Sequence, residues 1–342
     1  MPKPGTVDTH KSLNADVADT MRFWARAMRE APMNIVCVDA VRFGVEDLDA
    51  CRRFLRDLGV AEAEAAVDRS LFRTPEGSEV DLRLVADPDL PPAVKAGSTI
   101  REFVFGVKSQ SDLAAIGEEL SRDRQVHTDT SGSLHTMDDS GYGIAFRVSR
   151  TKRLITELPA VNVPHLAKRV DQRVAFEGPV LVRRLSHITY WTPDSAAAER
   201  FYVQRLKFRV TDRFAGLGTF MRASGTGDHH TLFAMTAPHQ SGLDHFSFEL
   251  DHVQDVLVAG MALTNKGWKN YLGPGRHIIG SNWFWYVESP FGGACELMAD
   301  FDQMTDAWTP GDFSPRNTSI AGWMDTASWA LFQERMRRYA QH

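Results

Sequence analysis

Two regions of the chain show the same order of apolar and polar positions. A mostly apolar run typical of a strand is followed by an aspartate, Asp47 or Asp194, and then by apolar residues at helical spacing that include Phe54 or Phe201. Because an aspartate at this place caps the first turn of a helix, each region predicts a strand and a capped helix. Corresponding residues in the two regions lie 147 positions apart.

Two further pairs of segments repeat in the same order along the chain. Residues 100–113 match residues 243–256 at an offset of 143, and residues 138–148 match residues 288–298 at an offset of 150. Three successive matches predict two similar halves. Each half is expected to contain two short units of a strand, a helix and further strands.

The segments outside the repeat complete a division into five predicted parts. Residues 1–32 predict an added helix, because "VADTMRFWARAMRE" is amphipathic at helical spacing. The two halves span residues 33–150 and 180–300. Scattered prolines and weak periodicity in residues 151–179 predict a linker that runs along the surface. The tail, residues 301–342, is expected to cover a sheet edge or an opening.

Composition narrows the classes of partner and the cellular compartment. The chain has 342 residues and a net charge of −5, with basic residues interspersed among acids, so nucleic acid and anionic membrane surfaces are not expected partners. It contains no apolar run long enough to span a membrane and no signal-peptide order at its start, so we expect a cytoplasmic protein. The three scattered cysteines predict neither disulfides nor a thiolate metal site.

The repeat also serves as an internal control for candidate metal ligands. His187 aligns with Ala40, His245 with Glu102 and Glu296 with Phe146, so the second half carries a His, His, Glu set that the first half lacks. Since similar halves share a fold, packing does not require these side chains. Two histidines and one carboxylate are typical of non-haem Fe(II) oxygenases. Fe(II) is the first expectation and Mn(II) the second, and spacing alone leaves Zn(II) open.

The segment that leads to Glu296 carries a further motif. Gly275, His277, Trp285-Tyr286, Ser289-Pro290, Gly292 and Glu296 follow one another at the spacing of a family signature, from which Trp285 and Ser289 depart slightly. With this motif, residues 33–300 resemble the type I extradiol ring-cleavage dioxygenases of the vicinal oxygen chelate superfamily. The resemblance implies an α+β fold in which tandem βαβββ units form two barrel-like domains, with the metal in the second.

The resemblance also implies a role for each matching residue. His187, His245 and Glu296 would be the iron ligands, and His230 the active-site acid or base. His277 and Tyr286 would form hydrogen bonds with the substrate or with bound oxygen. The expected reaction is cleavage of a catechol ring beside its hydroxyl groups by O2, which gives a semialdehyde-type product without an organic cofactor. A homo-oligomer that acts in the catabolism of aromatic compounds is expected.

Other interpretations of the same residues stay open at this point. A 4-hydroxyphenylpyruvate dioxygenase-like enzyme, a glyoxalase-type isomerase and a non-catalytic protein that binds aromatic compounds could all use this scaffold. Tyr286 could be a simple core aromatic, and we expect His229 to point to the opposite face of a strand from His230. Four other aromatic side chains are expected to be core residues: Trp191, Trp283, Phe284 and Trp285.

Overall fold

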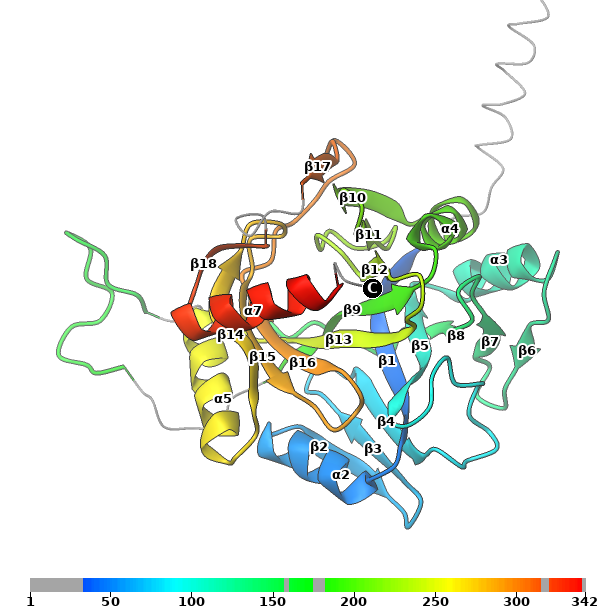
Figure 1. Cartoon of the computed structure of the whole chain (residues 1–342), viewed down its shortest axis with the longest axis horizontal. Coiled ribbons are helices and arrows are strands. Elements are labelled where there is room, and N and C mark those ends of the chain that lie inside the picture. Colours follow the sequence, from blue (N-terminus) through cyan, green and yellow to red (C-terminus); the bar gives the residue numbers. More distant parts are fainter. Residues whose placement is uncertain (1–32, 157–159, 175–181, 315–319, 340–342) are drawn as a thin grey trace, which may run out of the picture.

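The computed structural model describes residues 33–156, 160–174, 182–314 and 320–339. Two mixed β-sheets lie side by side, one from each half of the chain, with helices on their outer faces (Figure 1). The predicted helix within residues 1–32 lies outside the described residues. No helix in the described part of the chain has the length and apolar character needed to cross a membrane.

The first sheet has eight strands in the order β2-β3-β4-β1-β5-β8-β7-β6. Its first unit consists of β1 (Ile35–Val45), α2 (Leu48–Asp57), β2 (Ala61–Ala65), β3 (Arg69–Arg73) and β4 (Glu79–Leu84). Its second unit consists of β5 (Thr99–Val107), α3 (Gln110–Leu120), β6 (His127–Thr128), β7 (Leu134–Met137) and β8 (Gly143–Val148).

The second sheet repeats this arrangement in the order β10-β11-β12-β9-β13-β16-β15-β14, with one extra strand at each edge. Its first unit consists of β9 (Arg184–Thr192), α4 (Ser195–Arg200), the π-helical turn η1 (Phe201–Arg205), β10 (Arg209–Phe214), β11 (Gly218–Arg222) and β12 (Leu232–Thr236). Its second unit consists of β13 (Gly242–Glu249), α5 (Val253–Asn265), β14 (Asn270–His277), β15 (Trp283–Glu288) and β16 (Ala294–Ala299).

The four βαβββ units confirm the predicted α+β fold. In every unit the first strand pairs in parallel with the last, and the two units of a half meet through an antiparallel pair, β1 with β5 or β9 with β13. The predicted caps are also present. Asp47 accepts a hydrogen bond from the backbone N–H of Ala50, and Asp194 accepts one from the N–H of Ala197.

The carboxyl-terminal tail covers both edges of the second sheet. Strand β17 (Gly311–Phe313) pairs with β10, and β18 (Ala321–Met324) pairs with β14. Helix α7 (Thr326–Tyr339) then lies in front of β14 in Figure 1. Ser328 of this helix is buried and donates a hydrogen bond to the carbonyl of Gly273 in β14.

The two halves share one continuous hydrophobic core, and polar groups also join them. The hydroxyl of Tyr142, from the first half, donates to the carbonyl of Trp191 at 2.7 Å and accepts from the N–H of Gly242 at 2.6 Å. Tyr142 thereby connects the ends of two neighbouring strands of the second half. A Cβ atom added at Gly292 would lie 1.8 Å from the carbonyl oxygen of Ser98, so the backbones of the halves are in close contact there.

The described part of the predicted linker, residues 151–156 and 160–174, contains no regular helix or strand beyond an isolated bridge between Val163 and Leu166. Nearly all side chains of residues 160–174 are exposed, and the segment stands away from both sheets in Figure 1. The predicted course along the surface is therefore wrong for these residues.

Candidate metal centre

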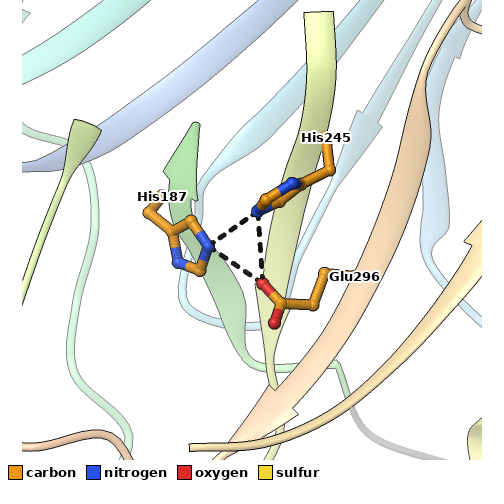
Figure 2. A group of neighbouring side chains, drawn as sticks. All are labelled: His187, His245 and Glu296. Carbon is orange, nitrogen blue, oxygen red and sulfur yellow. Dashed lines mark hydrogen bonds and ion pairs between the residues drawn. The ribbon is translucent and has the colours of Figure 1, made fainter. Parts of the chain in front are cut away.

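Three neighbouring strands bring His187, His245 and Glu296 together. They come from β9, β13 and β16, and their side chains point toward one another in Figure 2. The register explains the convergence, because His245 lies opposite Thr189, two residues from His187, and Ser247 lies opposite Glu296. Side chains two residues apart on a strand share one face of the sheet.

The three possible ligand atoms form a small triangle. His187 Nε2 lies 3.2 Å from His245 Nε2 and 2.9 Å from Glu296 Oε2, and the third side measures 3.7 Å. Two ligands that bind one ion at about 2.1 Å and at a right angle are about 3.0 Å apart. The triangle therefore has the size expected for three ligands on one face of a metal ion.

Hydrogen bonds from surrounding side chains orient two members of the triangle. Asp244 Oδ2 accepts from His245 Nδ1 at 2.7 Å, which places the ring proton on Nδ1 and leaves the lone pair of Nε2 directed at the centre. Trp191 Nε1 donates to the other oxygen of Asp244 at 3.1 Å. On the opposite side, the amide of Asn282 donates to Glu296 Oε1 at 3.2 Å. Because Asn282 binds Oε1, the other oxygen, Oε2, is the one directed at the two histidines.

Burial and charge indicate that a divalent cation fits this site. Glu296 is fully buried, and its Oε2 has no partner in hydrogen-bond geometry although His187 Nε2 is close. Burial alone would raise the pKa of Glu296, but the imidazoles of His187, His277 and His245 hold this pKa well below its usual value. Burial also lowers the pKa of His187, against the charge of Glu296. A carboxylate and neutral imidazoles with converging lone pairs are a donor set for Fe(II), Mn(II) or Zn(II).

The first half shows what the scaffold contains without these ligands. Because β8 pairs with β5 as β16 pairs with β13, matching His245 to Glu102 also matches Glu296 to Ala145. The alignment of Glu296 with Phe146 is therefore wrong by one residue. A shift of one position along a strand moves a side chain to the opposite face, and Phe146 belongs to the hydrophobic core.

The register correction strengthens the comparison between the halves. Ala40 and Ala145, which correspond to the first histidine and the glutamate, are buried and form an apolar cluster with Val104 in the first half. Glu102, which corresponds to the second histidine, is held by Arg42 and by His135, whose Nδ1 lies 2.8 Å from the carboxylate. An apolar contact and an ion pair thus occupy the place of the three ligands.

The three ligand atoms lie in a cavity of about 160 Å³ in the second half. Helix α7 and the segment before β18 contribute Phe332 and Ile320 to its wall. None of the described residues that line the cavity is a lysine or an arginine. Apolar side chains form most of the rest of the wall: Trp191, Phe214, Leu217, Phe220, Phe233, Met235, Leu272 and Ile279.

His277 and Tyr286 form a hydrogen-bonded pair beside the triangle. His277 Nδ1 lies 2.7 Å from the carbonyl oxygen of Ile320, so this nitrogen carries the proton. His277 Nε2 therefore accepts from the hydroxyl of Tyr286 at 2.9 Å. Burial, followed by the charge of Glu296, raises the pKa of Tyr286 well above its usual value. The predicted pair thus presents a protonated phenol next to the metal ligands.

His230 lies against the ring of His187, with 4.3 Å between the ring centres, and lines the cavity. Burial, together with the neighbouring His187 and His229, lowers the pKa of His230 well below its usual value. The expectation for His229 is wrong, because both histidines lie in the connection before β12. Their Nδ1 atoms are 2.9 Å apart and their ring planes are nearly perpendicular, at 87°, so the two side chains meet instead of pointing to opposite faces.

Sequence reasoning missed several residues of the site. Asp244, which directly precedes His245, could have been found, since a carboxylate often orients a metal-binding histidine. It is an extra residue in the pairing of β13 with β9, and such a bulge redirects side chains. Asn282 and Phe220 gave no local signal. Trp191, assigned to the core, is buried but also lines the cavity.

Comparisons with known proteins agree with this geometry. Residues 184–297 match the model of the Glyoxalase/Bleomycin resistance protein/Dioxygenase superfamily. These residues form a domain of that superfamily. The superfamily domain contains all three residues of the triangle, His230, His277 and Tyr286.

Relatives of the whole chain extend beyond the superfamily domain. Metapyrocatechase 2 from Cupriavidus necator is 28% identical over 329 residues, which are 91% of this chain and 94% of that protein. A Mn(II)-bound glyoxalase from Novosphingobium aromaticivorans has a TM-score of 0.68 at 20% identity, and the match covers 85% of this chain and 91% of the glyoxalase chain. The 2,3-dioxygenase LapB from Pseudomonas sp. KL28 has a TM-score of 0.66 at 18% identity, with 83% and 99% covered. These two structures share the fold of this chain.

Proposed function

We propose that the protein is an extradiol dioxygenase that cleaves the ring of a catechol beside its hydroxyl groups with O2. The observation that carries the proposal is the triangle of His187, His245 and Glu296 in an apolar cavity that also holds His230 and Tyr286. The relative named metapyrocatechase, which aligns over nearly the whole chain, supports the same reaction.

His187, His245 and Glu296 would hold the metal, with Fe(II) as the proposed ion and Mn(II) as the second choice. When bound, the ion supplies sites for both catechol oxygens and for O2, and a path for electrons between them. Three protein ligands with a total charge of −1 leave room on the ion for a catecholate.

The other residues of the cavity would bind the substrate and manage protons. The phenol of Tyr286 can donate a hydrogen bond to a substrate oxygen in place of the one that it donates to His277, because its high pKa keeps it protonated at neutral pH. His230 can accept a proton from a catechol hydroxyl, since its low pKa keeps the imidazole neutral. The apolar wall would hold the ring and exclude water, and it favours a catechol with an uncharged substituent.

The test is O2 consumption by protein reconstituted without air with Fe(II) or, separately, with Mn(II). Addition of catechol or an alkylcatechol should consume one O2 per substrate and give a yellow ring-opened product. His187→Ala should abolish both metal retention and turnover, whereas His239→Ala, at an exposed position between β12 and β13, should change neither. Tight catechol binding without O2 uptake would instead indicate a binding protein, and metal-dependent isomerase activity without O2 would indicate a glyoxalase-type enzyme.

A further inference from the structure

A chain of three buried side chains leads from strand β10 to the cavity. Asp212 Oδ2 lies 2.7 Å from His229 Nε2, and His229 Nδ1 lies 2.9 Å from His230 Nδ1. Asp212, His229 and His230 are 3%, 0% and 5% exposed, so water does not compete for these hydrogen bonds. His230 is the member of the chain that lines the cavity.

Backbone groups hold both Asp212 and His229, the two residues that support His230. The second carboxylate oxygen of Asp212, Oδ1, accepts from the N–H of Gly311 in β17 at 2.7 Å. The N–H of His229 donates to the carbonyl of Asp302 at 3.0 Å. Since each group has a partner on either side, neither ring nor carboxylate can turn without loss of a buried hydrogen bond.

The order of donors and acceptors follows from elementary chemistry. A carboxylate only accepts hydrogen bonds, so His229 Nε2 carries the proton that it donates to Asp212. An imidazole in its neutral form has one N–H, so a neutral His229 that donates to Asp212 offers a lone pair at Nδ1. His230 Nδ1 must then be the donor in the second hydrogen bond, which leaves His230 Nε2 with a lone pair.

We propose that Asp212 and His229 are positioning residues that fix His230 in the tautomer with its proton on Nδ1 and its Nε2 free to accept a proton. The role in turnover rests on the proposed dioxygenase function, but the order of the hydrogen bonds does not. A proton that leaves a catechol hydroxyl would go to His230 Nε2, giving an imidazolium whose Nδ1–H remains directed at His229. The opposite tautomer would present an N–H to the substrate hydroxyl and could not take its proton.

Asp212→Asn is the most informative variant. Its Oδ1 can still accept from Gly311, so the contact with β17 is kept, while an NH2 group replaces Oδ2. This NH2 donates to His229 Nε2, so His229 donates to His230 and the proton of His230 moves to Nε2. We expect kcat to fall by roughly 10²–10⁴-fold, the scale of losing a general base, with KM and metal content near those of the wild type. Asp312→Asn is the matched control, because it makes the same change at an exposed position of β17, next to Gly311. Its kcat should stay within about twofold of wild type.

Nitrogen-15 NMR of the Zn(II)-loaded, histidine-labelled protein tests the tautomer without any reaction. The His230 signals, assigned by their loss in His230→Phe, should show a protonated Nδ1 in wild type and a protonated Nε2 in Asp212→Asn. A protonated Nε2 in the wild type overturns the inference, as does an Asp212→Asn variant with the changed tautomer and full kcat. If the Asn variant does not fold, the wild-type spectrum alone decides the tautomer. A protein with the expected spectrum but no ring cleavage would contradict the proposed function and leave the hydrogen-bond order standing.

Discussion

The wall of the cavity predicts which catechols the enzyme prefers. Apolar side chains dominate the wall, none of its described residues is a lysine or an arginine, and the carboxylates of Asp244 and Glu296 are present. An alkyl substituent gains about 0.8 kcal/mol for each buried CH2 group, which is roughly a fourfold rise in kcat/KM per carbon while the substituent still fits. A carboxylate in the same place would be a buried charge without a partner. Such a buried charge costs about 3–5 kcal/mol, which lowers kcat/KM by roughly 10²–10⁴-fold.

The assay is O2 uptake by the metal-loaded enzyme with catechol, a series of 4-alkylcatechols and a carboxymethylcatechol of similar size. We expect kcat/KM to rise along the alkyl series and to be lowest for the carboxylate. Met235→Arg, which places a cation in the wall, should reduce the difference in kcat/KM between the alkylcatechols and the carboxymethylcatechol. Met235→Leu should preserve this difference. If the wild-type enzyme cleaves the carboxymethyl compound as efficiently as the alkyl one, the reasoning from the wall is refuted.

Three further predictions concern the metal and the stability of the fold. Added metal at 100 times its Kd should stabilise the wild type by about 2.7 kcal/mol, which raises the Tm of a chain of this length by roughly 4 °C. Glu296→Gln should abolish this rise in Tm. An equal rise in both proteins would contradict the ligand role of Glu296. Ala40→His should leave the metal content at one ion per chain by elemental analysis, since Arg42 still pairs with Glu102. Burial raises the pKa of Asp138 from 3.8 to about 6, so the free energy of unfolding of the wild type falls as the pH rises between these values. Between pH 4 and pH 7, Asp138→Asn should gain up to about 3 kcal/mol over the wild type in urea unfolding. If the difference in unfolding free energy between the two proteins stays constant with pH, burial of the Asp138 charge is not its cause.

The fold could be predicted because the repeat is encoded in local patterns. Each unit places a strand before a capped helix, and Asp47 and Asp194 keep this signal at corresponding positions. The exact register was harder to predict. The offset of 150, taken from similar residue types, aligned Phe146 with Glu296. The hydrogen-bonded pairing of β8 with β5 shows that Ala145 is the residue that corresponds to Glu296.

The ligand triangle could be proposed from sequence because its members are polar residues within apolar strands. The supporting residues could not, since their partners are distant in sequence. Asp212 lies 17 positions before His229, and its carboxylate reaches the ring only because β10 and the connection before β12 are neighbours in the folded chain.

The tail has a consequence for the order in which the enzyme becomes competent during synthesis. Gly311 binds the carboxylate behind His229, and Ile320 binds His277, so one late segment supplies a backbone partner to each side of the cavity. A ribosome releases these residues after every metal ligand has already emerged. The two histidine networks therefore become complete only after all three ligands have been synthesised, and Ile320 follows Glu296 by 24 residues.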